Sequence, residues 1–241
     1  MAGHSKFANI KHKKERSDSK RSKIFTKIGR ELAVSVKHGG PNPETNPRLR
    51  DVITKAKANN MPNENIDRGI KKASGELGDV NYEAVTYEGY GPGGIAVIVN
   101  TLTDNRNRTA ANVRNAFTKG GGNLGQNGSV EFLFKRIGHI LIERGQNIKE
   151  EELMINVLEV GATDFIPQEE GYEIITEAIE FTKVLDKIKD TFPILSAEII
   201  MQPLTTITLT EKDEIKKFNK MLDLLEDDDD VQDFFHNYEE N

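Results

Sequence analysis

The apolar positions in the first third of the chain recur every three or four residues, which is the spacing of amphipathic helices. The first predicted helix begins after a serine cap near residue 18 and ends at Gly39-Gly40-Pro41. A second helix is predicted from Pro47 to Asn60 and a third from Pro62 to Gly75. Because the loops between them are short, we expect residues 18–78 to form a small helical bundle.

Beyond Gly78 the pattern changes to short apolar runs bounded by glycine and proline, with helical stretches between them. Residues 136–202 follow the β-α-β-β-α-β order of a ferredoxin-like unit. The last elements lack partners of their own and would complete a sheet begun at residue 82 if they returned to it. The predicted order is strand 82–90, strand 94–103, helix 109–119, strand 130–134, strand 136–144, helix 150–160, strand 163–166, strand 171–177, helix 180–191, strand 195–202, strand 205–210, helix 211–226 and strand 231–236.

These elements predict an α+β, multidomain protein in which an N-terminal three-helix bundle precedes two α+β domains, one ferredoxin-like and inserted in the other. The residues before the bundle hold too few apolar side chains to offset their ordering entropy, so they are expected to form a mobile arm. The expected division is a basic mobile arm at 1–17, the helical bundle at 18–78, an α+β domain at 79–134 plus 204–241, and the inserted ferredoxin-like domain at 135–203.

Composition excludes several classes of protein. The 241 residues include no cysteine, which removes disulfide frameworks, thiolate zinc sites, iron–sulfur clusters and cysteine nucleophiles. No apolar run approaches the ~18 residues of a membrane-spanning helix, and no apolar segment follows the basic N-terminus as in a signal peptide. We therefore expect a cytoplasmic protein with no membrane partner.

The net charge of −6 hides a strong asymmetry along the chain. Residues 1–75 hold 18 Lys and Arg against 7 Asp and Glu, whereas residues 76–241 hold 15 against 32. A local positive field persists even on an acidic molecule, so this distribution indicates a polyanion-binding N-terminal part on an acidic body.

Basic side chains bind nucleic-acid phosphates with release of counterions, largely without regard to sequence. The arm and the first helix supply most of the candidates, and the alternative interpretation is a solvated helix face behind a disordered tail. The predicted nucleic-acid-binding residues are Lys6, Lys11, His12, Lys13, Lys14, Lys20, Arg21, Lys23, Lys27, Arg30, Arg106, Arg108 and Arg114.

The last three of these residues belong to a second basic segment, Asp104 to Thr109 with Arg114 further along. It lies where a strand passes into a helix, and helix N-termini attract phosphate oxygens. The segment is equally well explained as a capping loop in which Asp104 pairs with Arg106 or Arg108. Both interpretations stay open at the level of sequence.

No catalytic constellation, metal site or cofactor site is predicted. The glycine-rich stretches 89–94 and 120–125 lack the Gly-Lys-Ser/Thr ending of a phosphate loop and are interpreted as turns. The five histidines show no metal-binding spacing and no neighbouring carboxylate motif, and the run Glu226 to Asp230 lacks EF-hand spacing, so it is expected to be a solvated loop.

Several longer motifs resemble the YebC/PmpR family, and the resemblance covers essentially the whole chain. Phe7 stands where many members carry Trp, and the C-terminal half matches in pattern more than in residues. The motifs are Met1–Lys14, Lys23–Lys27, Asn46–Arg50, Ala56–Asn63, Tyr87–Gly94, Asp104–Thr109 and Gly121–Phe134.

The resemblance implies three domains, with a ferredoxin-like domain inserted in another α+β domain. Members are generally described as probable transcriptional regulators that bind DNA in the cytoplasm, and some relatives act on translation, including relief of proline-dependent ribosome stalling. The family offers no agreed catalytic residue.

The leading hypothesis is a non-enzymatic nucleic-acid-binding regulator of gene expression, acting as a DNA-binding transcriptional regulator on duplex DNA. The alternative is a ribosome-associated translation factor that binds ribosomal RNA and relieves stalled elongation. Two other classes are weighed below these: a nuclease or hydrolase using Asp104 with a histidine, and an adaptor that engages a basic partner through its acidic domain.

Overall fold

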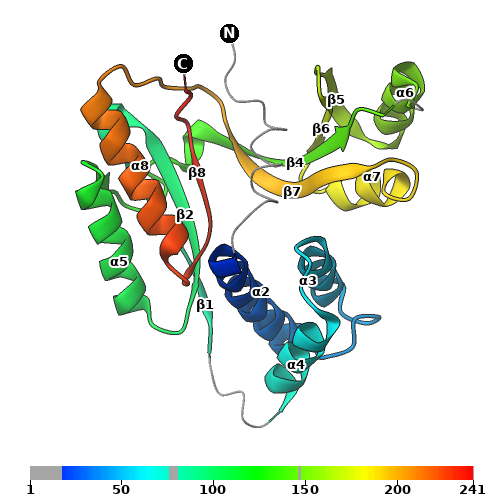
Figure 1. Ribbon diagram of the computed structural model, residues 1–241, viewed down its shortest axis with the longest axis horizontal. Coiled ribbons are helices and arrows are strands. Elements are labelled where there is room, and N and C mark those ends of the chain that lie inside the picture. The colour runs from blue at the N-terminus through cyan, green and yellow to red at the C-terminus, as the bar shows by residue number, and fades with distance from the viewer. Residues whose placement is uncertain (1–17, 76–80, 146–147, 241) are drawn as a thin grey trace. The chain divides into compact units, whose positions relative to one another are not determined.

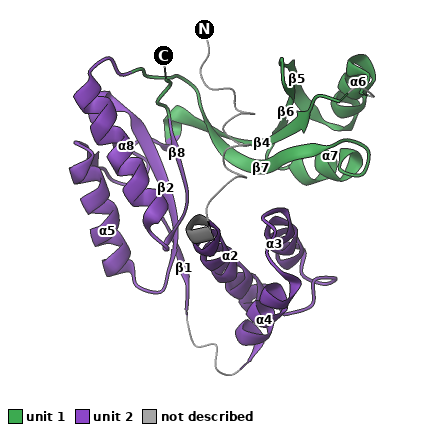
Figure 2. Ribbon diagram, in the orientation of Figure 1, with its two compact units in different colours: residues 1–15, 132–208, 237–241 green, residues 16–131, 209–236 purple. Residues whose placement is uncertain are grey.

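The computed structural model describes residues 18–75, 81–145 and 148–240, and the expected arm lies outside them. These residues form two compact units (Figure 2). One unit contains the described residues up to Glu131 together with 209–236. The other contains the described residues of 132–208 together with 237–240.

Three helices open the first unit, as predicted: α2 (Asp18–Gly39), α3 (Pro47–Ala58) and α4 (Asn63–Ser74). The buried Asn46 joins the first two, because its side-chain oxygen accepts the Leu49 N–H at 3.1 Å and caps α3. Its amide nitrogen donates to the carbonyls of Ser35 and Gly40, each at 2.8 Å. The apolar faces of the three helices meet in one core, formed by Ile28, Leu32, Val36, Leu49, Val52, Ala56, Met61 and Ile66.

The first unit also holds an antiparallel sheet in the order β3-β1-β2-β8. The strand β8, from the end of the chain, pairs with the central strand β2. Two helices lie side by side on one face of this sheet (Figure 1). The elements are β1 (Glu83–Tyr90), β2 (Ala96–Thr103), α5 (Arg106–Lys119), β3 (Asn123–Leu124), α8 (Lys212–Asp227) and β8 (Val231–His236).

The second unit contains the predicted ferredoxin-like order of elements, with the sheet order β5-β6-β4-β7. Its core lies between the sheet and its two helices and includes Ile140, Leu153, Ile174 and Val184. In the sequence this whole sheet stands between β3 and β8, so the α+β fold class with an inserted ferredoxin-like part is confirmed. The elements are β4 (Phe134–Glu143), α6 (Glu150–Val160), β5 (Ala162–Pro167), β6 (Gly171–Glu177), α7 (Phe181–Ile188) and β7 (Ile194–Pro203).

Two predicted strands are wrong, each because the backbone finds a different partner. At 130–134 the chain forms a 3₁₀ turn, η2 (Glu131–Leu133), since the N–H groups of Val130 and Glu131 donate to the Glu88 carboxylate rather than to a strand. At 205–210 no strand forms, because Ile207 makes a single parallel bridge, to Tyr238.

The start of α5 also differs from the prediction, by three residues. The Asn105 side chain accepts the Arg108 N–H at 3.0 Å, so the helix begins at Arg106 instead of Thr109. An asparagine cap of this kind satisfies a backbone donor that the first helical turn leaves without a partner.

Candidate nucleic-acid interface

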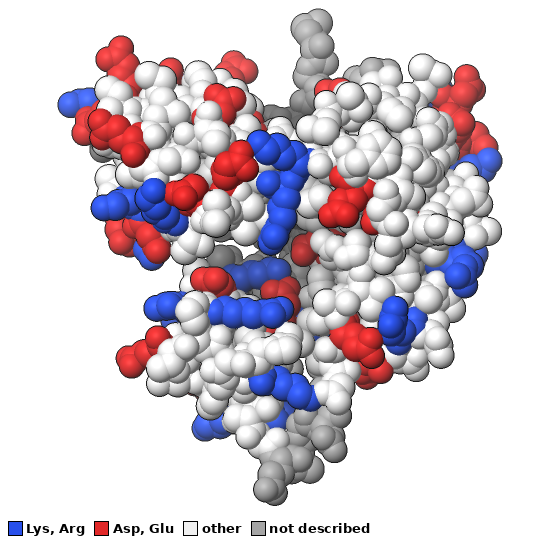
Figure 3. All heavy atoms as spheres, turned by 180° about the vertical axis from the view of Figure 1, so that it is seen from behind, with Lys and Arg blue, Asp and Glu red and all other residues white. Residues whose placement is uncertain are grey.

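The described part of the bundle keeps the positive excess seen in the sequence. Residues 18–75 carry 13 Lys and Arg against 6 Asp and Glu. In Figure 3, basic side chains gather over the helices of the bundle at the lower part of the view. The charge is therefore displayed on a folded surface as well as in the N-terminal residues.

The cations of α2 are not all available to a phosphate, because the chain supplies its own acidic partners. Lys23 pairs with Asp227 at 2.6 Å, and the Lys27 ammonium donates to the Glu226 carbonyl at 3.3 Å. Arg30 donates to the Asp230 carboxylate and, at 3.1 Å, to the Leu102 carbonyl. The acidic run 226–230, expected to be a solvated loop, comprises the end of α8 and the turn before β8, and it is a partner of the first helix. We call it the acidic turn 226–230.

The pKa values of the two lysines follow these surroundings. The hydrogen bond that Lys23 donates to Asp227 raises the pKa of Lys23. Burial lowers the pKa of Lys27, and the nearby carboxylates, Asp233 first, offset this in part. Lys27 therefore carries its charge at a desolvation cost, which is unlike an open phosphate-binding lysine.

Asp230 is the centre of this cluster and is itself buried. Its Oδ2 accepts from Arg108 Nη2 at 2.8 Å and from the Thr109 hydroxyl at 2.7 Å. Burial raises the pKa of Asp230, but the hydrogen bonds from Thr109, Arg108 and Arg30 outweigh burial and lower it overall. A carboxylate held by two guanidinium groups fixes the end of β8 against α2 and α5.

The segment Asp104 to Thr109 forms the capping loop that one of the two interpretations expects, and phosphate binding by its arginines stays a prediction. Arg108 Nη2 lies 2.7 Å from Asp104 Oδ1, so the capping-loop pair forms. The hydrogen bonds that Arg108 donates to Asp230 and, second, to Asp104 raise the pKa of Arg108. Arg106 is about two-thirds exposed, with Glu83 at 3.8 Å. Arg114 is exposed on α5 and forms no ion pair within the residues that the structure describes.

The other predicted phosphate-binding residues belong to α2 or precede it in the sequence. Arg21 is exposed on α2, and Lys20 belongs to the same helix, although its side chain is outside the description. The residues of the expected arm lie outside the described part of the chain: Lys6, Lys11, His12, Lys13 and Lys14.

A set of exposed cations on α3 and α4 was missed at the level of sequence. Within the described ranges none of them has an ion pair, in contrast to those of α2. The sequence does carry a signal for them, because α3 has no acidic residue in its first turn and Asp51 alone along its length. The set comprises Arg48, Arg50, Lys57, Arg68, Lys71 and Lys72.

The glycine-rich stretches contain turns, as predicted, at 92–94 and 120–121, but the second stretch also contains β3. Gly93 and Gly94 adopt positive φ, and a Cβ at Gly122 would lie 2.2 Å from the Tyr90 carbonyl oxygen. The buried Glu88 carboxylate then holds the loop after β3, accepting the N–H groups of Gly128, Val130 and Glu131 at 2.7–2.9 Å. Its burial raises the pKa, but these three bonds lower it overall.

One histidine–carboxylate contact appears that the sequence did not indicate. His139 Nε2 lies 2.8 Å from Glu173 Oε1 on the adjacent strands β4 and β6, and both side chains are buried. Gln168 donates to the other oxygen of Glu173 at 2.9 Å. Across the described ranges, no group of three or more histidine or acidic side chains is arranged to hold a metal ion.

The described helices include none with the length and apolar character of a membrane span.

Comparison with known proteins covers both units. The family model described as the TACO1/YebC protein N-terminal domain matches residues 5–76, and the one described as the TACO1/YebC second and third domain matches residues 82–238. A "probable transcriptional regulatory protein" of Acetivibrio thermocellus is 56% identical over 239 residues, covering 99% of both chains. One of Agathobacter rectalis with the same name is 54% identical over the full length of both chains.

A solved structure also matches. The crystal structure of a conserved hypothetical protein from Aquifex aeolicus superimposes with a TM-score of 0.80 at 46% identity, covering 93% of this chain and 92% of that one. Sequence and fold agree over nearly the whole length, and the chain belongs to the TACO1/YebC family.

Proposed function

We propose that this protein is a non-enzymatic nucleic-acid-binding regulator of gene expression that holds the phosphate backbone with its helical bundle. The observation that carries the proposal is the positive excess of residues 18–75 on an otherwise acidic chain. Phosphate contacts supply affinity without base readout, and their strength follows the number of cations that can reach the backbone.

The cations fall into two groups, according to whether they already contact acidic groups of the chain. Arg48, Arg50 and Lys57 on α3, together with Arg106 and Arg114 on α5, have no short ion pair in the described structure and can meet phosphates directly. Lys23, Lys27, Arg30 and Arg108 would first have to give up their contacts with the acidic turn 226–230. The first group is therefore expected to supply most of the affinity, with the basic N-terminal residues beside it.

DNA is the target that the names of the relatives favour, since both are called probable transcriptional regulatory proteins. In this form the protein is a DNA-binding transcriptional regulator acting in the cytoplasm. Duplex binding of this kind needs no cofactor and no metal.

A ribosome-associated translation factor is the second candidate, favoured by the surface of α4. If α4 entered a major groove as a recognition helix, its N-terminal turns would lead, and these carry Glu64 and Asp67. Carboxylates there repel phosphates, whereas the exposed cations of α3 attract them. Backbone contacts to structured RNA fit such a surface as well as contacts to DNA.

Ultraviolet crosslinking in living cells, followed by sequencing of the bound nucleic acid, tests the proposal. Discrete promoter DNA with little RNA supports the transcriptional form, and ribosomal RNA clustered at one functional site supports the translational form. A variant with Arg48, Arg50 and Lys57 changed to Ala serves as the control and is expected to give a weaker signal. The absence of any signal above background for the wild type would refute nucleic-acid binding.

A further inference from the structure

A second basic surface lies on α5 and α8, in the half of the sequence whose overall charge is acidic. The α5 sequence contains four cations and no carboxylate. On α8, Lys212, Lys216 and Lys220 recur every four residues and are all exposed. Residues four apart on a helix follow one another about 6 Å apart along the axis, so the backbone positions of these three lysines form a row along α8.

The two helices are neighbours in space although about 100 residues separate them in the sequence. A Cβ at Gly120, which follows α5, would lie 2.6 Å from the Met221 Cβ of α8, and one at Gly121 would lie 3.4 Å from the Lys217 Cδ. The exposed Lys119 therefore ends α5 beside the middle of α8. We define the α5–α8 basic surface as Lys119, Lys212, Lys216 and Lys220.

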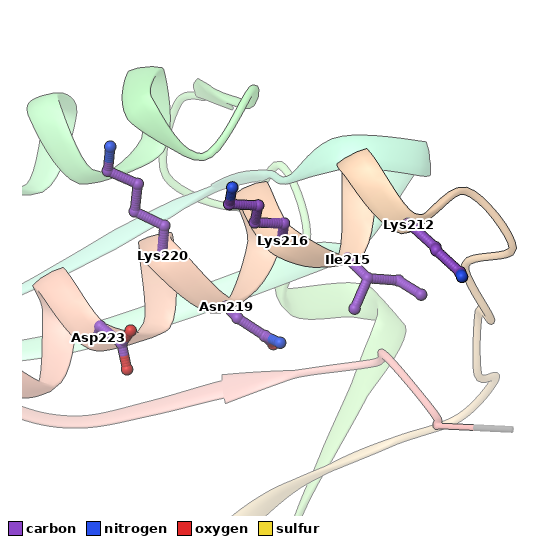
Figure 4. Close-up of a pocket in the computed structure, with 6 residues that line it drawn as sticks. All are labelled: Lys212, Ile215, Lys216, Asn219, Lys220 and Asp223. Atoms are coloured by element: carbon purple, nitrogen blue, oxygen red, sulfur yellow. The ribbon is translucent and has the colours of Figure 1, made fainter.

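Most acidic residues of α8 are directed elsewhere. Asp213 pairs with Lys217 at 2.7 Å, and Glu214 Oε2 approaches the position that a Cβ at Gly93 would occupy, in the turn between β1 and β2. A groove of about 480 Å³ runs along the row of lysines. Asp223 is the one carboxylate that lines this groove. Figure 4 shows Lys216 and Lys220 projecting from the same side of α8, and Lys212 projecting from the side on which Ile215 and Asn219 lie. The four lysines of the surface form no ion pair within the described ranges.

The dipole of α8 does not account for Lys212. The N-terminal end of a helix favours negative charge, which Asp213 and Glu214 supply in the first turn of α8, yet Lys212 opens the helix. A protein–protein interface usually has an apolar or aromatic centre. Ile215 is the sole apolar side chain that lines the groove, so the groove does not fit a protein partner well. Exposed ammonium groups that follow one another along a helix fit a chain of phosphates better.

We propose that the α5–α8 basic surface is a second contact site for the phosphate backbone of the nucleic acid that the bundle binds. This inference rests on the proposed function and extends it to a site within the C-terminal half. The two sites would then hold one nucleic acid, and the loss of either would weaken binding without abolishing it.

The test compares the full-length wild type with a variant in which Lys212, Lys216 and Lys220 are changed to Ala. Binding to a fluorescently labelled DNA duplex and to ribosomal RNA is measured over a series of salt concentrations. We expect affinity at physiological salt to fall roughly 10- to 100-fold and the salt slope to fall by about 0.9 for each lost duplex contact. The corresponding Lys→Arg triple variant keeps the charges and is expected to keep the affinity.

The matched control changes Lys183, Lys187 and Lys189 of the ferredoxin-like unit to Ala, which removes the same charge from another surface. Equal losses in the two triple variants would mean that net charge alone acts, and this would overturn the inference. Unchanged nucleic-acid binding by the α8 variant would also overturn the inference. So would an α8 variant that keeps nucleic-acid binding and loses only binding to vesicles containing phosphatidylserine. If the wild type itself binds neither nucleic acid, the proposed function fails; if it binds and only the α8 variant is unaffected, the inference alone fails.

Discussion

Asp230 forms ion pairs with both Arg30 of α2 and Arg108 of α5. Its carboxylate is buried and accepts from Arg30, Arg108 and Thr109. Arg30 is itself mostly buried, with a side-chain exposure of 15%, and its guanidinium lies over the Tyr82 ring. Removing the carboxylate therefore leaves a largely desolvated cation without its partner.

The Asp230→Asn variant is expected to lower the free energy of unfolding by about 2–4 kcal/mol, because breaking one side of a buried pair strands the other charge. Urea denaturation followed by circular dichroism measures the change. Asp223→Asn removes the same charge from an exposed position of α8 and is expected to change stability by less than about 0.5 kcal/mol. Equal unfolding midpoints for the wild type and Asp230→Asn would contradict the role of this cluster.

The lowered pKa of Asp230 also predicts how stability depends on pH. Its contribution is fully present above the ordinary aspartate pKa of about 3.9 and is lost as the pH falls through the lower value of the folded state. Across this acid range the wild type is expected to lose more stability than Asp230→Asn. Parallel stability curves for the two proteins below pH 4 would show that Asp230 is not linked to folding.

Glu88 has a comparable role in the loop after β3. Glu88→Gln replaces one acceptor oxygen by an amide nitrogen, so at least one of the three backbone N–H groups loses its bond, at a cost of about 1–3 kcal/mol. Hydrogen exchange is expected to accelerate at Gly128, Val130 and Glu131. Unchanged protection of these three amides would mean that the loop is held by other contacts.

Among the elements, α2 and α3 are both basic but differ in their partners. Three cations of α2 contact the turn at 226–230, namely Lys23, Lys27 and Arg30. Arg50 and Lys57 of α3 have no ion pair in the described part of the chain. We expect this difference to decide which helix a nucleic acid contacts.

Arg50→Ala with Lys57→Ala is expected to weaken nucleic-acid binding more than Lys23→Ala with Lys27→Ala, although both double variants lose two charges. Each lost duplex contact lowers the salt slope by about 0.9. Fluorescence anisotropy at several salt concentrations measures both affinity and slope. A larger loss for the α2 variant would instead indicate that the acidic turn releases α2 when nucleic acid binds.

The elements themselves were largely predictable because their signals are local. The periodicity of Ile28, Leu32 and Val36 reports the buried face of α2 directly. The two strands that were wrongly predicted depend on distant partners: a side-chain carboxylate from β1 takes the backbone donors after Gly128, and residue 207 meets residue 238. Tertiary contacts override local preference in these two segments, so local sequence patterns could not predict their structure.

At the scale of the whole molecule, the sequence was enough to predict the charge asymmetry, but not which basic residues form ion pairs with which acidic ones. The turn at 226–230 lies about 200 residues after α2, so no spacing rule connects Lys23 with Asp227. The row on α8 was likewise hidden, because its lysines alternate with the acidic residues that give this half its negative charge. The boundaries of the expected domains stay predictions.

The most direct test of nucleic-acid binding through the phosphate backbone is the salt dependence of binding by the full-length protein. The logarithm of the binding constant is measured against the logarithm of salt concentration for a DNA duplex and for ribosomal RNA. We expect a steep linear decrease for at least one of them, and a shallower one after Arg48, Arg50 and Lys57 are changed to Ala. A binding constant that does not respond to salt, or a slope that this variant leaves unchanged, would contradict the proposed interface.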